Sequence, residues 1–343
     1  DSPDPRTGRP YGPDFPEITM GDVVRTQVAL VDHLGIARLR AVVGGSMGGM
    51  QAMLWATRHA ERVAAVALLA TAHRLNAQAL AFDVVARNAI IRDPDFAGGA
   101  YYGREHGPEV GLAIARMLGH ITYLSRESMQ GKFEADRHRP RPLDTAFEAQ
   151  FSVGSYLAYQ GERFVERFDA NTYLRLSLAI DRFDLGADHA ALSAAVAAST
   201  CRWLVVSFSS DWLFPPQQSR ELVRALLAAG RQVSSCEIAS RAGHDAFLLA
   251  NELDLYGPLV AAVVDGGIGS VPRAADALGH EPGSVFYDDR LDYDRICGLI
   301  RPQAAVLDLG CGAGGLLARL RDRGHRRCVG VELDQRQVAL AVG

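Results

Sequence analysis

The most informative stretch of the chain is Leu39-Arg-Ala-Val-Val-Gly-Gly-Ser-Met-Gly-Gly-Met50, where a short apolar run leads directly into a serine set among glycines. The run favours a buried strand, and residues 51–59 favour a helix. Gly44-Gly-Ser46-Met-Gly48 therefore matches G-x-S-x-G between a strand and a helix, the context in which this motif holds a serine hydroxyl at the end of a sheet. Such a match alone also fits a tight packing turn, so the prediction of a nucleophile at Ser46 depends on the rest of the chain.

Strands and helices alternate on both sides of this motif. Residues 19–34 have the apolar spacing of a helix, with Gly35 as its C-cap. Further buried strands are predicted at 63–69, 202–208 and 233–238. This alternation predicts an α/β fold built on a parallel sheet.

Three other segments complete the pattern. Residues 74–190 are mostly helical by periodicity and contain no convincing strand, so they are expected to be a helical insertion in the sheet. Residues 215–229 favour a helix with proline near its start, and Gly243-His-Asp-Ala-Phe-Leu248 is expected to open the last helix of this part. Residues 265–284 have the glycine and proline content of a linker.

An acid and a histidine follow the serine in the order that a Ser–His–Asp site on this fold requires. A serine hydroxyl is a weak nucleophile unless a neighbouring base removes its proton. Asp211 follows the strand at 202–208, and His244 follows the strand at 233–238. We predict that His244 takes the proton of Ser46 while Asp211 orients the imidazole. Taken singly, each is also compatible with a helix cap or a surface side chain.

Composition limits the classes of protein to consider. The 343 residues are 48% hydrophobic and 22% charged, as in one large or two moderate globular domains. A net charge of -4 offers no basic surface for nucleic acid, and no apolar run is long enough for a membrane helix. The five cysteines include no C-x-x-C pair, which argues against structural zinc. We therefore expect a cytoplasmic protein without a metal, a membrane contact or a signal peptide.

A second glycine-rich turn lies near the C-terminus. Ala304-Ala-Val-Leu-Asp-Leu309 predicts a strand, Gly310-Cys-Gly-Ala-Gly-Gly315 a turn, 316–323 a helix and 328–333 another strand. Glycines there let the backbone approach a ligand, and an acid after the second strand can bind ribose hydroxyls. Asp308 before these glycines resembles the form of the motif found in methyltransferases, and this resemblance implies Asp308, Gly310, Gly312 and Glu332 as candidate S-adenosylmethionine-binding residues. A vestigial pocket or an interaction module is the alternative.

Four stretches of the first 264 residues together resemble the homoserine O-acyltransferases of the MetX type. They are Phe15-Pro-Glu-Ile-Thr-Met-Gly-Asp-Val-Val-Arg25, Gly44-Gly-Ser-Met-Gly-Gly-Met-Gln51, Asp211-Trp-Leu-Phe-Pro-Pro216 and Gly243-His-Asp-Ala-Phe-Leu248. The resemblance implies an α/β-hydrolase fold with a helical lid at 74–190. It also implies acyl transfer from acyl-CoA to the hydroxyl of homoserine through an acyl-serine, with no required cofactor, by a protein that is usually a homodimer.

The resemblance assigns roles to individual residues. The implied catalytic residues are Ser46, Asp211 and His244, with the backbone N–H of Met47 as an oxyanion donor. Arg116, in Ala115-Arg-Met-Leu-Gly-His-Ile-Thr122, resembles the lid arginine expected to hold the substrate carboxylate, a partner that suits a guanidinium fork. Asp245 resembles the residue that holds the homoserine amino group.

The acyl donor is predicted to be acetyl-CoA. A buried succinyl carboxylate needs a positive partner, and succinyl-using relatives tend to carry an arginine two residues after the triad aspartate, where this chain has Leu213. Met47 also follows the nucleophile as in acetyl-type members. The alternatives are a succinyl donor, an esterase and a non-catalytic scaffold.

Residues 285–343 resemble the start of the MetW methionine-biosynthesis proteins, which have an S-adenosylmethionine-methyltransferase-like fold. MetW-type proteins partner with these acyltransferases, so the expected organisation is an acyltransferase domain at 1–264, a linker at 265–284 and a MetW-like segment at 285–343. Both ends are expected to be incomplete. The resemblance places before Asp1 the first strands of the sheet and a second oxyanion donor.

Overall fold

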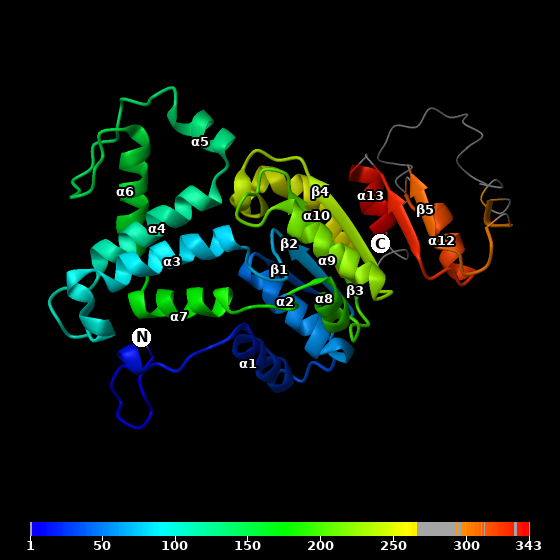
Figure 1. Cartoon of the computed structure of the whole chain (residues 1–343), viewed down its shortest axis with the longest axis horizontal. Coiled ribbons are helices and arrows are strands. Elements are labelled where there is room, and N and C mark those ends of the chain that lie inside the picture. The colour runs from blue at the N-terminus through cyan, green and yellow to red at the C-terminus, as the bar shows by residue number, and fades with distance from the viewer. Residues whose placement is uncertain are drawn as a thin grey trace.

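The computed structural model describes residues 2–265, 293, 296–298, 300–309, 311, 313–332 and 335–342. Its main sheet has four parallel strands in the order β1-β2-β3-β4 (Figure 1). Their bounds are β1 Val42–Gly45, β2 Ala65–Leu69, β3 Arg202–Phe208 and β4 Val233–Ile238. The predicted strands are confirmed, although β1 begins three positions later than predicted, because Leu39 pairs with Val63 only through an isolated bridge.

Helices cover both faces of the sheet, which explains the continuous apolar sequence of its central strands. Along β2, Val66 and Leu68 belong to the cluster on one face, whereas Ala65, Ala67 and Leu69 belong to the cluster on the other. The first face packs against α1 (Met20–His33), α2 (Met47–Arg58), α8 (His189–Val196) and α9 (Pro216–Ala228). The second face packs against α10 (Ala250–Asp265).

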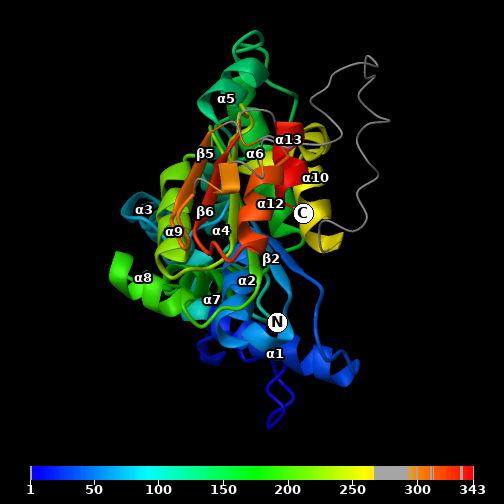
Figure 2. The same ribbon diagram turned by 90° about the vertical axis from the view of Figure 1, so that its right-hand side faces the viewer.

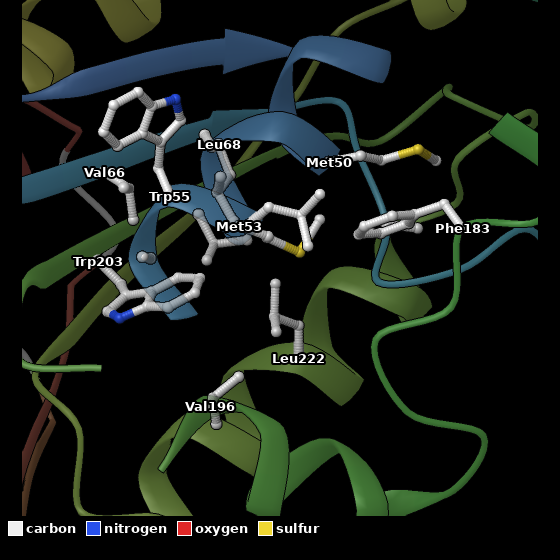
Figure 3. Packing of buried hydrophobic residues seen from close by; sticks show 14 of the residues in the cluster. Met50, Met53, Trp55, Val66, Leu68, Phe183, Val196, Trp203 and Leu222 are labelled. Atoms are coloured by element: carbon white, nitrogen blue, oxygen red, sulfur yellow. The ribbon is translucent and has the colours of Figure 1, made fainter. Parts of the chain in front are cut away.

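The larger of the two clusters lies on the first face. Trp55, Met53, Trp203 and Leu222 are all fully buried there, and Figure 3 shows how α2, β3 and α9 bring them together. Burial of large apolar side chains is the main favourable term in folding. This cluster therefore fixes α2, and with it the turn that precedes α2, against the sheet.

The helix α1 begins and ends where its sequence predicts. Thr19 and Asp22 form a capping box, in which Thr19 Oγ1 accepts from the Asp22 N–H at 3.2 Å and Asp22 Oδ2 accepts from the Thr19 N–H at 2.8 Å. Gly35 follows the helix with a φ of 69°, the left-handed conformation of a C-terminal cap. The predicted helix and its glycine cap are confirmed.

Five of the helices between β2 and β3, from α3 to α7, form a separate helical layer, which we call the lid. Figure 1 shows this layer beside the sheet. Its helices are α3 Ala77–Ile91, α4 Glu109–Tyr123, α5 Arg126–Phe133, α6 Ser152–Val165 and α7 Ala170–Asp181. They enclose a small core of their own, with Ile90, Leu112 and Phe164 buried in it. The prediction of a helical insertion without strands is confirmed for 74–190, all of which the structure describes.

The C-terminal part has two short parallel strands, β5 (Val306–Leu309) and β6 (Cys328–Val331), joined through α12 (Gly315–Asp322) and followed by α13 (Gln335–Val342). The predicted strand–helix–strand order is confirmed. Figures 1 and 2 show α13 beside α10, and Val338, Ala339 and Val342 pack against the cluster on the second face of the main sheet. The predicted linker at 265–284 lies outside the described residues, except for Asp265.

Within the described part of the chain, no helix combines the length and the apolar character that crossing a membrane requires.

Candidate active site

Ser46 occupies a strained turn between β1 and α2. Its φ of 52° and ψ of -122° form a conformation that residues with side chains rarely adopt. Three hydrogen bonds hold the turn: the Ser46 N–H donates to Leu69 O at 2.9 Å, and Ser46 O accepts from Thr71 Oγ1 at 2.7 Å and from the Gly49 N–H at 3.0 Å. The end of β2 therefore helps to fix the position of the serine.

A close backbone approach makes a glycine necessary just before the turn. A Cβ atom on Gly44 would lie 2.1 Å from Gly48 O, a distance that no side chain tolerates. A Cβ atom on Gly48 would meet nothing within 4 Å. The first glycine of the G-x-S-x-G motif is thus required by the tight crossing of strand and helix, whereas the last one contributes its backbone rather than the absence of a side chain.

The structure brings Ser46, His244 and Asp211 into one hydrogen-bonded line. Ser46 Oγ lies 2.9 Å from His244 Nε2, and His244 Nδ1 lies 2.9 Å from Asp211 Oδ2. Both partners of the serine are buried, with His244 3% and Asp211 2% exposed. Asp211 Oδ1 accepts from the backbone N–H groups of Leu213 and Phe214 at 3.0 and 2.9 Å, which fixes the carboxylate.

The line has the polarity that general-base catalysis needs. A carboxylate only accepts hydrogen bonds, so His244 donates its Nδ1 proton to Asp211 and presents the Nε2 lone pair to the Ser46 hydroxyl. Met47 is the first residue of α2, and its backbone N–H has no acceptor within the helix. That N–H lies next to the serine and is free to stabilise an oxyanion.

His244 does not open a long helix, and this prediction is wrong. It lies in a short 3-10 turn, η4 (Gly243–Leu248), and α10 starts separately at Ala250. Leu249 has an extended backbone, with φ -90° and ψ 132°, so the helical hydrogen bonds cannot continue through it.

Arg116 lies on α4, on the lid side of the site. Its guanidinium carbon is 4.8 Å from the centre of the Phe164 ring and 5.6 Å from that of Tyr123, and its buried Nε has no partner among the described residues. Asp245 directly follows His244. Burial raises the pKa of the Asp245 carboxyl, while the charges of His244, Arg116 and Lys132 oppose the shift. The structure therefore brings a cation and a carboxyl group near His244.

Polar residues that the sequence analysis missed also line this region. Tyr123 packs beside His244 with ring centres 6.0 Å apart, and His120 packs beside Tyr123 at 6.0 Å. Together with Arg116 they occupy positions i, i+4 and i+7 of α4, which share one face of a helix. Polar residues at this spacing in an otherwise apolar helix could have indicated in the sequence that this face of α4 lines the site.

A buried ionic cluster joins α3 to α7 beneath the same region. Arg87 Nη2 lies 2.5 Å from Asp181 Oδ2, with both side chains only 10–11% exposed. Burial and the neighbouring carboxyl group of Asp181 raise the pKa of Asp83 to about 8, although Arg87 opposes the shift. Oδ1 of Asp181 has no donor among the described residues. A proton retained on Asp83 lets this side chain donate to the neighbouring carboxylate of Asp181.

The C-terminal candidate residues are only partly described. Asp308 lies on β5 and Glu332 directly follows β6, so the two acids lie at the carboxyl ends of neighbouring parallel strands. Burial raises the pKa of the Cys311 thiol, and the negative charges of Asp308 and Glu332 raise it further. Gly310 and Gly312 lie outside the described residues. The ribose-binding role of the two acids stays a prediction.

No group of three histidine, cysteine or acidic side chains in the described ranges is arranged to hold a metal ion.

The parallel sheet, the strained serine turn and the Ser46–His244–Asp211 line define an α/β hydrolase. The profile of the alpha/beta hydrolase fold matches residues 1–250. The profile described as methionine biosynthesis protein MetW matches residues 290–343.

Curated relatives narrow the class. The bifunctional methionine biosynthesis protein MetXA/MetW of Rhodopirellula baltica is 50% identical over 97% of this chain and 53% of that protein. The homoserine O-acetyltransferase of Mesorhizobium japonicum is 48% identical over 78% of this chain and 68% of that protein. The homoserine O-succinyltransferase of Leptothrix cholodnii is 52% identical over 72% of this chain and 66% of that protein.

Solved structures agree with the fold. Homoserine O-acetyltransferase from Bacillus anthracis matches with a TM-score of 0.67 and 26% identity over 79% of this chain and 71% of that one. Esterase E22 matches with a TM-score of 0.68 and 26% identity over 77% of this chain and 71% of that one. The chain belongs to the α/β-hydrolase family and, within it, to the homoserine O-acyltransferases of methionine biosynthesis, with a MetW segment after the hydrolase part. It spans about half the length of the bifunctional relative and about two thirds of the acyltransferases.

The tight crossing at the serine turn gives a matched pair of variants. Gly44→Ala forces a Cβ into the Gly48 carbonyl, so it should lower the free energy of unfolding by about 3 kcal/mol or more, at the upper end of overpacking effects. Gly48→Ala meets open space and should leave stability unchanged or raise it by up to about 1 kcal/mol, since alanine is the better helix former. Urea unfolding measures both, and equal midpoints for the two variants would contradict this explanation of the motif.

The raised pKa of Asp83 predicts a dependence of stability on pH. The folded protein keeps a proton that the unfolded chain releases above about pH 4, so this group lowers the free energy of unfolding as the pH rises from about 4 to 8. The slope from one group is at most about 1.4 kcal/mol per pH unit. Asp83→Asn should remove this contribution and raise the melting temperature at pH 8 relative to the original chain. The exposed Asp144→Asn variant is the control, and parallel pH profiles for all three proteins would show that Asp83 titrates normally.

Proposed function

We propose that this chain transfers an acetyl group from acetyl-CoA to the hydroxyl of L-homoserine through an acyl-serine. The observation that carries the proposal is the hydrogen-bonded line from Asp211 through His244 to Ser46, with Arg116 and Asp245 beside it. A nucleophile with its base explains acyl transfer, and a cation beside a carboxyl group explains an amino acid as the acceptor. The names of the relatives support the same reaction class.

The first half of the reaction forms the acyl-enzyme. His244 Nε2 takes the proton of Ser46 as Oγ attacks the thioester carbon, and the resulting oxyanion accepts a hydrogen bond from the Met47 N–H. The carbon–sulfur bond then breaks, and the imidazolium returns its proton to the departing CoA sulfur. Asp211 stabilises the imidazolium through its hydrogen bond to Nδ1.

The second half transfers the acyl group. His244 takes the proton of the homoserine hydroxyl as that oxygen attacks the ester carbon of Ser46. The bond from Oγ to the acyl carbon breaks, and the proton passes from His244 to Oγ. Arg116 holds the homoserine carboxylate and Asp245 its ammonium group, which places the hydroxyl beside the ester.

Transfer rather than hydrolysis requires that water be kept from the acyl-enzyme. The lid carries Arg116 on α4, and Trp212, next to Asp211, donates through Nε1 to Leu124 O of the lid at 3.0 Å. A lid fastened at this point and two substrate-holding charges favour the bound alcohol over water. An esterase with the same triad has no need of the charged pair.

The donor is assigned to acetyl-CoA because of Leu213. Its backbone N–H donates to Asp211 Oδ1, and its side chain packs against the main core, so this position offers no charge to a succinyl carboxylate. Succinyl-CoA is the second candidate, since close relatives are named for either donor.

Two further assignments stay predictions. The protein is expected to be a homodimer. S-adenosylmethionine binding through Asp308, Gly310, Gly312 and Glu332 is tested by equilibrium dialysis. A vestigial pocket or interaction module, the alternative for this segment, binds none.

Release of CoA in the presence of homoserine tests the proposed reaction. We expect homoserine-dependent release from acetyl-CoA that Ser46→Ala reduces by a factor on the order of 10³ or more, because the nucleophile is lost. The assay is run on this chain and on one extended at its N-terminus to the length of the acyltransferase relatives. Labelled acetyl trapped on Ser46 is the supporting readout. If CoA is released at the same rate without homoserine, the chain is an esterase. If the extended chain releases no CoA from either donor, a non-catalytic scaffold is favoured.

The donor assignment has its own test in Leu213→Arg. A guanidinium at this position should shift the ratio of kcat/KM for succinyl-CoA over acetyl-CoA upward by about tenfold, a typical value for a new charge-assisted hydrogen bond. Leu213→Met, which keeps the apolar character, is the control. A preference for succinyl-CoA in the original chain would overturn the acetyl assignment and leave the mechanism intact.

A further inference from the structure

One face of α4 carries more hydrogen-bonding groups than the proposed reaction has used. Arg116, His120 and Tyr123 occupy positions i, i+4 and i+7 of this helix and therefore share one face. Gly119 lies close to the same face, since a Cβ atom on it would lie 3.2 Å from the Tyr123 hydroxyl. The ring centre of Tyr123 lies 6.0 Å from that of His120 and 6.0 Å from that of the catalytic His244, so Tyr123 contacts both histidines. His120 therefore belongs to the acceptor side of the site, one ring behind the base.

His120 is buried with one ring nitrogen paired and the other free. The side chain is 8% exposed, and its Nδ1 lies 3.0 Å from the hydroxyl of Tyr156 on α6. Its Nε2 is fully buried and has no partner among the described residues, as is also true of Arg116 Nε on the same helix face. A buried polar nitrogen without a partner is rare in folded proteins, because leaving it unpaired is unfavourable. Two on one face indicate that both face a ligand.

The hydrogen bond to Tyr156 determines which nitrogen of His120 carries the proton. We assign the Tyr156 hydroxyl as the donor in this hydrogen bond, because Nδ1 of His120 is its only acceptor among the described residues. Burial and the nearby charges of Arg116, Lys132 and Arg167 lower the pKa of His120 to about 4, so the ring is neutral at pH 7. A neutral ring that accepts at Nδ1 carries its proton on Nε2. The unpaired nitrogen is therefore a donor.

The surrounding charges select an anion as the partner of this donor. Arg116 lies one helical turn away, and Lys132, the only lysine of the chain, has its Nζ 4.3 Å from the centre of the Tyr156 ring. Asp245, the carboxyl group that feels both cations, is assigned to the ammonium end of the acceptor. The positive charges and the two unpaired N–H groups of Arg116 and His120 favour a negatively charged oxygen as their common acceptor.

We propose that His120 Nε2 is a second donor to the carboxylate of the acceptor amino acid, beside Arg116, and that the Tyr156 hydroxyl positions it by fixing the ring tautomer. The proposal rests on the proposed function, since it takes homoserine as the acceptor. It makes His120 a substrate-binding residue and Tyr156 a positioning residue. In this arrangement the guanidinium of Arg116 donates to one carboxylate oxygen, and the Nε2–H of His120 donates to the other and so fixes the orientation of the carboxylate.

Steady-state kinetics with three variants test this. His120→Leu removes the donor and should raise KM for homoserine by about tenfold or more, the usual effect of a lost hydrogen bond to a charged group. KM for acetyl-CoA should stay unchanged. His120→Gln keeps an N–H near the position of Nε2 and should recover much of the loss. Tyr156→Phe should raise KM for homoserine less than His120→Leu does, because the ring remains but its tautomer is no longer fixed.

Two controls separate this role from a structural one. With 3-amino-1-propanol, which is homoserine without its carboxylate, His120→Leu and the original chain should react equally. The exposed His106→Gln variant should behave as the original chain with both acceptors. Equal losses with both acceptors, or a raised KM for acetyl-CoA instead of homoserine, would overturn the proposal.

A binding measurement keeps the inference distinct from the reaction itself. Homoserine should raise the melting temperature of the Ser46→Ala protein, and His120→Leu in that background should abolish most of the rise. If the chain binds homoserine through His120 but releases no CoA, the proposed function fails and the carboxylate site stands. If His120→Leu leaves the rise unchanged, the carboxylate site fails whatever the enzyme does.

Discussion

The arrangement of this protein depends on the forced turn at Ser46. Ser46 has a positive φ that residues with side chains rarely adopt. Hydrogen bonds to Leu69 O and from Thr71 Oγ1 hold its backbone at the end of β2, and the Gly49 N–H of α2 holds it from the other side. In this turn β1 and α2 cross so closely that residue 44 has no room for a Cβ atom, so it must be glycine. The buried cluster around Met53 and Trp203 keeps that crossing in place. The favourable packing of this core therefore offsets the unfavourable backbone conformation of Ser46.

The site combines two structural parts with different tasks. The sheet supplies Ser46, Asp211 and His244 from the loops that follow β1, β3 and β4, where rigid backbone fixes their separations. The lid supplies Arg116, His120 and Tyr123 from one helix face. In the proposed reaction the triad therefore comes from the sheet, whereas Arg116 and His120, which we propose to hold the acceptor carboxylate, come from the lid. This division lets one catalytic line serve esterases and transferases alike.

Sequence reasoning predicted the part of the site that depends on local pattern. The strands, the serine turn and the order of Ser46, Asp211 and His244 follow from short runs whose meaning does not require knowledge of the rest of the fold. The contacts of His120 with Tyr156, and of Asp83 with Asp181, join residues 36 and nearly a hundred positions apart across packed helices, so periodicity alone could not reveal them. The prediction of a helix that starts at Gly243 was wrong because the backbone of Leu249 is extended, and the apolar spacing of the sequence gives no sign of that conformation.

The packing of α13 on α10 has a consequence for how the chain unfolds. Val338, Ala339 and Val342 cover apolar surface that belongs to the core of the hydrolase part, far earlier in the sequence. Surface shared between two units makes the stability of each depend on the other, so they lose structure cooperatively. We therefore expect that disruption of the short C-terminal strands also lowers the stability of the sheet that carries the serine.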